Sequence, residues 1–258
     1  MILHQRSIIA FILIFLLIFS VETMAQDSDD IEALVNQAQA HYVDKQNEEA
    51  LEDYLKVLEI EPTHYEALHK TSLLYNMIGF QLEDEDEQHE NYKLAKKYGE
   101  LAVEHHPDKD ESHYVYSIAV GRITDFSSSR ERVRLAPVIK EHGEKAIEIN
   151  PEHAGAWHLL AVWHHNASNL NFAERTAVRV LGGLPDSSNE RAEKAFKKAI
   201  ALDNETIIFY LDFARFYEDM GEDEKAKQML NKAVALEPKI EGDEKYLKES
   251  KDMLASLG

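Results

Sequence analysis

The segment FKKAIALDNETIIFYLDFARFYEDMGEDEKAKQMLNKAVALEP, residues 196–238, decides the fold. Its apolar residues recur at intervals of three and four, the spacing of one face of an α-helix. The endings FKKAIALDN and LNKAVALEP have the same form, and Asn204 and Pro238 are 34 positions apart. Alanines lie where two helices would cross closely, and aromatic residues fill the hollows between neighbouring hairpins: Ala226, Ala233, Tyr210, Phe213 and Tyr217. We therefore predict a helical hairpin that repeats along the chain.

The same ending occurs three more times, as YLKVLEIEP (54–62), GELAVEHHP (99–107) and GEKAIEINP (143–151). A period of 34 residues is typical of the tetratricopeptide repeat. We predict an all-α, tetratricopeptide-repeat-like superhelical solenoid of about five hairpins. These hairpins are expected at residues 31–64, 65–109, 110–153, 154–206 and 207–240. A capping helix over residues 242–257 is expected to end a single domain that spans residues 26–258.

Repeats two to four are longer than the period, and we expect their extra segments between the two helices of each hairpin. The first, LEDEDEQHE (82–90), is typical of a solvated acidic loop. In the second, FSSSRERVRLAP (126–137), serines are placed to cap a helix. The third, residues 169–192, is expected to hold a helix from Phe172 to Leu181, stopped by Gly182 and Gly183, with Ser187 or Ser188 capping the next helix.

The charge of the chain excludes one class of partner. Its 48 acidic residues outnumber its 28 lysines and arginines, which gives a formal net charge of −20. A polyanion of this strength repels phosphate backbones, so we expect no nucleic-acid partner. The chain has no cysteine, which excludes disulfides, thiolate catalysis and thiolate metal sites.

The stretch AWHLLAVWHHN, residues 156–166, raises the question of a metal or haem site. Trp157, Leu160, Ala161 and His164 fall on packing positions of a repeat helix. His158 and His165 lie two turns apart, about 10 Å along the axis, which is too far for one metal ion. We therefore expect neither a metal nor a cofactor.

No catalytic motif of the common hydrolase, kinase, dinucleotide-binding or metalloprotease types is present. We predict a non-catalytic scaffold that binds a protein or peptide segment with some negative charge in the concave groove of the solenoid. The alternative is a His-assisted metal-binding or hydrolytic protein. The predicted groove residues come from the first helices of successive hairpins: His69, Tyr114, Arg122, His158, His165, Asn166 and Arg215.

The third insertion carries a family resemblance. The run from VIKEHGEKAIEINP through AWHLLAVWHHN to FAERTAVRVLGGLPDSSNERAEKAFKKAIALD resembles the regulator of microtubule dynamics family, whose members have this insertion in the same repeat. The resemblance covers about residues 92–257 and implies a binding protein without catalytic residues. It also implies a functional inserted edge, of which Phe172, Arg175 and Arg179 are present, whereas Gly182 and Gly183 stand where the family has an aromatic residue.

The N-terminal segment MILHQRSIIAFILIFLLIFSVETMAQ reads as a secretory signal peptide, residues 1–25. We expect cleavage after Ala25 and a periplasmic or secreted bacterial protein with no stable membrane insertion. The alternative is a membrane anchor at residues 8–21, although the apolar run is shorter than the roughly 20 residues that span a bilayer. N-terminal sequencing of the exported protein is expected to begin at Gln26, and Met1 retained in the membrane fraction would indicate an anchor.

Overall fold

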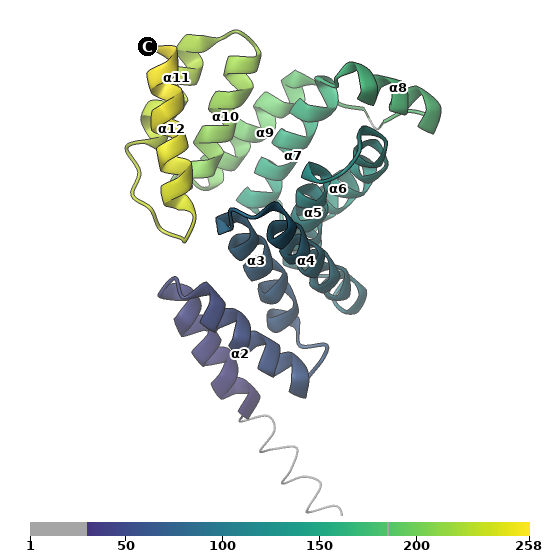
Figure 1. Cartoon of the computed structure of the whole chain (residues 1–258), viewed down its shortest axis with the longest axis vertical. Helices are drawn as coiled ribbons and strands as arrows, with labels where there is room; N and C mark the ends of the chain where they lie inside the picture. The colour runs from purple at the N-terminus through teal and green to yellow at the C-terminus, as the bar shows by residue number, and fades with distance from the viewer. Residues whose placement is uncertain (1–29, 185) are drawn as a thin grey trace, which may run out of the picture.

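The protein is described by a computed structural model that covers residues 30–184 and 186–258. The predicted signal segment lies outside the described residues, so its cleavage and the export of the chain stay predictions. The fold is all-α, as predicted, and the helices follow one another as a solenoid of antiparallel pairs (Figure 1). Within the described ranges, no helix is both long and apolar enough to cross a membrane.

Five helical hairpins form the stack. In the first, a helix at residues 30–43 packs on α2 (Asn47–Ile60) through a core that includes Ala38, Ala50 and Tyr54. The other hairpins pair α3 (Tyr65–Gln81) with α4 (Glu85–His105), α5 (Asp110–Asp125) with α6 (Ser129–Ile149), α7 (Ala154–Ser168) with α9 (Asn189–Leu202), and α10 (Ile207–Asp219) with α11 (Asp223–Ala233). The capping helix is α12 (Asp243–Leu257), which packs on α10 and α11.

The crossing points of the hairpins hold small side chains, as the repeat spacing predicts. Ala161, Ala192, Ala214 and Ala226 are fully buried in the C-terminal core. Aromatic rings fill the space between hairpins, and Phe196 of α9 stacks on Phe213 of α10 with 4.9 Å between ring centroids. Alanines and aromatic rings therefore join the fourth hairpin to the fifth.

The first two insertions differ from the expectation of inserted loops. Only residues 82–84 join α3 to α4 and only residues 126–128 join α5 to α6, so the extra residues lengthen the paired helices. The acidic run begins α4, where the Asp84 carboxylate accepts hydrogen bonds from the backbone N–H groups of Asp86 and Glu87. Carboxylates are favoured at a helix N-terminus by the unpaired N–H groups and the helix dipole, so this run continues a helix.

The capping predictions hold for the second and third insertions. Ser128 caps α6 by accepting from Glu131 N, and Ser188 caps α9 by accepting from Arg191 N. The third insertion contains α8 (Phe172–Leu181), which has a capping box at its start and ends at Gly182 with φ 93°. Pro185 lies outside the described residues. An ion pair of 2.8 Å between Arg132 Nε and Glu174 Oε1 holds α8 against α6, at the outer edge of the stack (Figure 1).

Candidate functional site

The predicted groove corresponds to the first helices of successive hairpins, which are the helix at residues 30–43 and α3, α5, α7 and α10. From α3 to α10, each of these helices contacts the next along this series. Side chains that point from this row of helices therefore come together, although they are far apart in sequence. The predicted groove residues all lie on α3, α5, α7 and α10.

The N-terminal half of the groove contains His69 and Tyr114. His69 is 7% exposed, and its Nδ1 lies 3.0 Å from the carbonyl oxygen of Tyr65. The ring of Tyr114 packs on His153 with 4.4 Å between centroids. This packing requires Gly155, because a Cβ atom there would lie 2.4 Å from the Tyr114 hydroxyl. Tyr114 is therefore held against the start of α7.

Sequence reasoning missed Lys70, Tyr42, Glu111 and His153 in this half. The ammonium group of Lys70 lies 4.2 Å from the ring centroid of Tyr42, and burial lowers the pKa of Lys70. Glu111 Oε1 lies 3.5 Å from His153 Nε2. Glu111 precedes the predicted Tyr114 by three positions on one helix, so helical spacing alone was a usable signal for it.

In the C-terminal half of the groove, each histidine has its own carboxylate. His158 Nε2 lies 2.9 Å from Asp212 Oδ2, and His165 Nε2 lies 2.9 Å from Asp219 Oδ2. Burial acts to raise the pKa of Asp212, but the hydrogen bond from His158 and the charge of Arg215 outweigh it, and this pKa is lowered. In the described part of the chain, no three histidine or acidic side chains gather as a metal site.

Both predicted arginines contact α12. Arg215 forms ion pairs with Asp212 on its own helix and with Glu249 on α12. Arg122 Nη2 donates to the Tyr246 hydroxyl at 3.4 Å, and its guanidinium carbon lies 5.3 Å from the ring centroid of Phe80. The remaining predicted residue, Asn166, is exposed.

The inserted edge lies apart from the groove. Phe172 is 85% exposed on α8, and together with Arg175, Thr176 and Arg179 it lines a shallow hollow of about 360 Å³. Arg175 Nε donates to the carbonyl oxygen of Leu170. The predicted residues of this edge therefore share one helical face of α8, whereas the predicted groove residues lie on α3, α5, α7 and α10.

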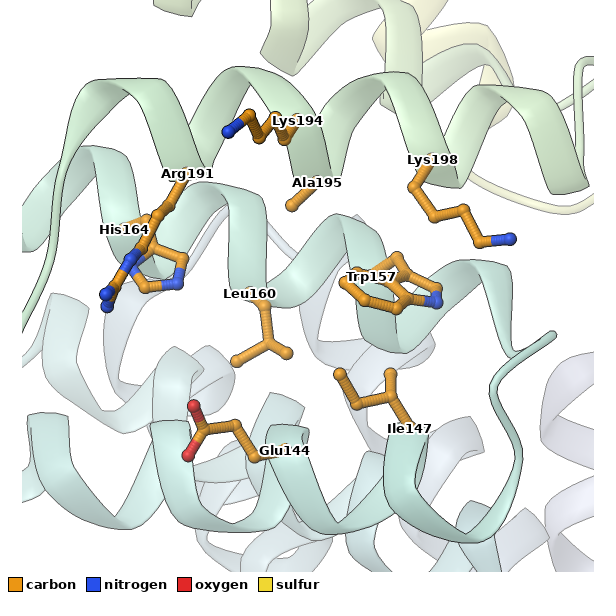
Figure 2. A pocket seen from close by; sticks show the side chains of 9 residues that line it. All are labelled: Glu144, Ile147, Trp157, Leu160, His164, Arg191, Lys194, Ala195 and Lys198. Atoms are coloured by element: carbon orange, nitrogen blue, oxygen red, sulfur yellow. The ribbon is translucent and has the colours of Figure 1, made fainter.

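A second pocket lies between α6, α7 and α9, and Figure 2 shows its lining residues. Its volume is about 430 Å³, with Ile147, Leu160 and Ala195 among its apolar residues. Lys194, Lys198, Arg191 and Glu144 supply charged side chains around it.

Trp157 has the packing role predicted for it, but it also lies at the edge of this pocket. Its indole N–H donates to the Pro151 carbonyl at 2.9 Å. The more deeply buried tryptophan is Trp163, at 5% exposure. Trp157 and Trp163 each lie three positions from Leu160, so helical spacing alone does not show which of them is buried.

His164, which also lines this pocket, yields a pH prediction. It is 8% exposed, and burial, followed by the charges of Arg191 and Lys140, lowers its pKa below the usual value. In the unfolded chain the pKa of a histidine is near 6.5, so His164 binds a proton at a higher pH there than it does in the folded protein. The stabilising effect of neutral His164 is therefore complete above about pH 6.5 and is lost as the pH falls toward the lower folded pKa.

As the pH falls from 8 to 5, we expect the free energy of unfolding of the wild type to decrease more than that of His164→Gln. Urea denaturation at pH 8, 7, 6 and 5 measures both proteins. The glutamine keeps a polar side chain but cannot be protonated in this range. Parallel stability curves for the two proteins would contradict the prediction.

The sequence of the chain is similar to that of a known family. A family model described as Regulator of microtubule dynamics protein 1-3 matches residues 34–258. Regulator of microtubule dynamics protein 1 of Mus musculus is 30% identical over 168 residues, which cover 63% of this chain and 54% of the mouse protein. Regulator of microtubule dynamics protein 2 of Bos taurus is 28% identical over 166 residues, covering 64% of this chain and 40% of that protein. The matched region thus spans about half or less of these relatives.

Among solved structures, a thermophilic tetratricopeptide-repeat protein of Thermus thermophilus is similar, with a TM-score of 0.61 and 18% sequence identity. The likeness covers 87% of this chain and 99% of the other. At this identity, it shows the fold alone.

Proposed function

The chain belongs to the regulator of microtubule dynamics family, and from this premise we propose that it is a non-catalytic scaffold that binds a protein or peptide segment in its concave groove. The family match and the tetratricopeptide-type fold support this class of function. Its bacterial source, its export from the cell and the binding of a protein or peptide partner stay predictions.

One observation carries the proposal: cationic and aromatic groups gather in the groove of a protein with net charge −20. Lys70 lies against Tyr42, Arg122 lies over Phe80, and Arg215 lies near the groove histidine His158 through their shared partner Asp212. A segment that carries carboxylates gains charge-assisted hydrogen bonds there. Glu111, Asp212 and Asp219 lie in the same groove, so charge favours a segment whose carboxylates face Lys70 and Arg122 and avoid these acidic groups.

Site-specific photo-crosslinking tests the location of the partner. A benzophenone amino acid is placed at Tyr42 in the groove or, as the control, at Tyr98 on α4, which stacks on Tyr75. We expect a defined adduct from Tyr42 and none from Tyr98, with mass spectrometry identifying the bound segment. Adducts that form only from a probe at Phe172 would instead assign binding to the inserted edge.

The Lys70 side chain is expected to contribute directly to that binding. Lys70→Ala should weaken the affinity for the crosslinked segment, prepared as a peptide, by about 1–2 kcal/mol. Lys97→Ala is the matched control, because Lys97 lies 5.2 Å from the Tyr98 ring centroid on α4 in a similar cation–aromatic pair. Calorimetric titration measures both variants, and equal losses of affinity would argue against the groove.

A further inference from the structure

We propose that α12 is an intramolecular ligand of the groove, and that the groove fits an amphipathic helix presenting an aromatic hydroxyl and, one turn later, a carboxylate. Such a partner competes with α12 for the same side chains. This inference rests on the proposed function, because it names the kind of partner for that groove and how access to it is regulated.

The aromatic contact joins α12 to two distant helices. Tyr246 stacks on Phe80 of α3 with 4.7 Å between ring centroids and 26° between the planes. Arg122 of α5 donates to the Tyr246 hydroxyl and also lies over Phe80. One side chain of α12 thus contacts the second and third hairpins at once.

The carboxylate contact follows one turn later on the same helical face. Glu249 pairs with Arg215 of α10, Arg215 pairs with Asp212, and Asp212 binds His158 of α7. The fourth and fifth hairpins are thereby linked to the same face of α12. Tyr246 and Glu249 supply the aromatic and acidic groups that we expect of a groove partner.

The reach of the C-terminal segment exceeds what a simple cap requires. A cap needs to cover only the last hairpin, and Met253, Leu254 and Leu257 do pack on the C-terminal core. Yet Lys245 Nζ donates to the carbonyl oxygen of Phe80 at 2.7 Å, 165 positions away in sequence. The preceding loop also reaches the first hairpin, where Lys45 Nζ donates to Pro238 O at 3.2 Å.

The polar contacts of α12 are suited to displacement. The side chains of Arg215 and Glu249 are 39% and 48% exposed. Ion pairs this exposed contribute little to stability, because water and salt screen them. Met253, Leu254 and Leu257 also hold α12 on the C-terminal core, so α12 can stay attached there when Glu249 leaves Arg215. Tyr246 packs on this core as well as on Phe80, so its ring leaves both contacts on release.

The test uses a fluorescent synthetic peptide of residues 237–258 as the probe and the full chain as the receptor. In the wild type, α12 occupies the groove, so the peptide is expected to bind weakly. The double variant Tyr246→Ala/Glu249→Arg frees the groove and is expected to bind the peptide about tenfold more tightly. Glu244→Arg, at an exposed position on α12, makes the same charge change and is expected to leave the affinity at the wild-type value.

A charge exchange separates release of α12 from damage to the fold. Amide hydrogen exchange of α12 is expected to accelerate in Arg215→Glu and in Glu249→Arg, and to return toward the wild-type rate in the combined variant. Circular dichroism melts verify that all variants fold. Equal peptide affinities in wild type and Tyr246→Ala/Glu249→Arg, together with unchanged α12 exchange in the single variants, would overturn the proposal. If Lys70→Ala still weakens partner binding in that case, the groove function stands and α12 is only a cap.

Discussion

Trp163→Ala is expected to lower the free energy of unfolding by about 3–5 kcal/mol, as for other large truncations of buried aromatic side chains. The indole is 5% exposed, its N–H donates to the Ala136 carbonyl at 2.7 Å, and its ring meets His164 edge-on at 5.1 Å between centroids. Removing it leaves a cavity between α6 and α7 and a carbonyl that loses its side-chain donor. Chemical denaturation followed by circular dichroism measures the loss.

Trp157→Ala is the matched control within the same helix. Because Trp157 already borders a pocket, its removal enlarges an existing hollow rather than opening a new one. We expect a smaller loss, about 1–2 kcal/mol. If Trp157→Ala destabilises the protein as much as Trp163→Ala, the orientation of α7 described for this structure is wrong.

Gly99→Val is expected to destabilise the protein by about 1–3 kcal/mol through overpacking of the α4–α5 contact. A Cβ atom at Gly99 would lie 2.9 Å from the Cα atom of Tyr116 and 3.1 Å from its backbone nitrogen. Backbone atoms cannot rotate away as a side chain does, so the two helices must separate. This separation also disturbs the hydrogen bond from the Ser72 hydroxyl to the Ala95 carbonyl, 2.8 Å long, beside the same contact.

Gly121→Ala is expected to stabilise the protein, in contrast to Gly99→Val. Gly121 lies inside α5, and a Cβ atom there meets nothing within 4 Å among the described residues. Alanine lowers the backbone entropy of the unfolded chain and favours the helix, so we expect a gain of about 0.4–1 kcal/mol. Thermal melts of both glycine variants are compared with the wild type, and shifts of the same sign would contradict the packing of α4 on α5.

Contacts with α12 change how far the predicted binding residues are available to a partner. Arg122 and Arg215 attract negative charge, but in this structure Tyr246 and Glu249 of α12 satisfy part of their bonding capacity. Lys70 and Tyr42 lie at the other end of the groove, where the Lys70 ammonium group lies over the Tyr42 ring. A partner segment is therefore expected to engage the N-terminal half first and to compete with α12 as it extends toward Arg215.

Local features of the sequence were sufficient to determine the repeat hairpins and the inserted helix. Apolar spacing shows which residues form a helix, and Asn171, Ser188 and Gly182 mark where helices begin and end. These signals work because helical hydrogen bonds and caps join residues only a few positions apart. The bounds of α8 match the predicted segment from Phe172 to Leu181 for this reason.

Tertiary structure alone decided which tryptophan is buried and which predicted groove residues contact α12. Both tryptophans lie on one helix, and which face of α7 meets α6 depends on the packing of the whole hairpin. The contacts of Lys245 with Phe80 and of Tyr246 with Arg122 join residues 165 and 124 positions apart. They form because small rotations between successive hairpins add up along the solenoid and bring the last helix back toward the second hairpin. No local pattern of residues encodes that sum.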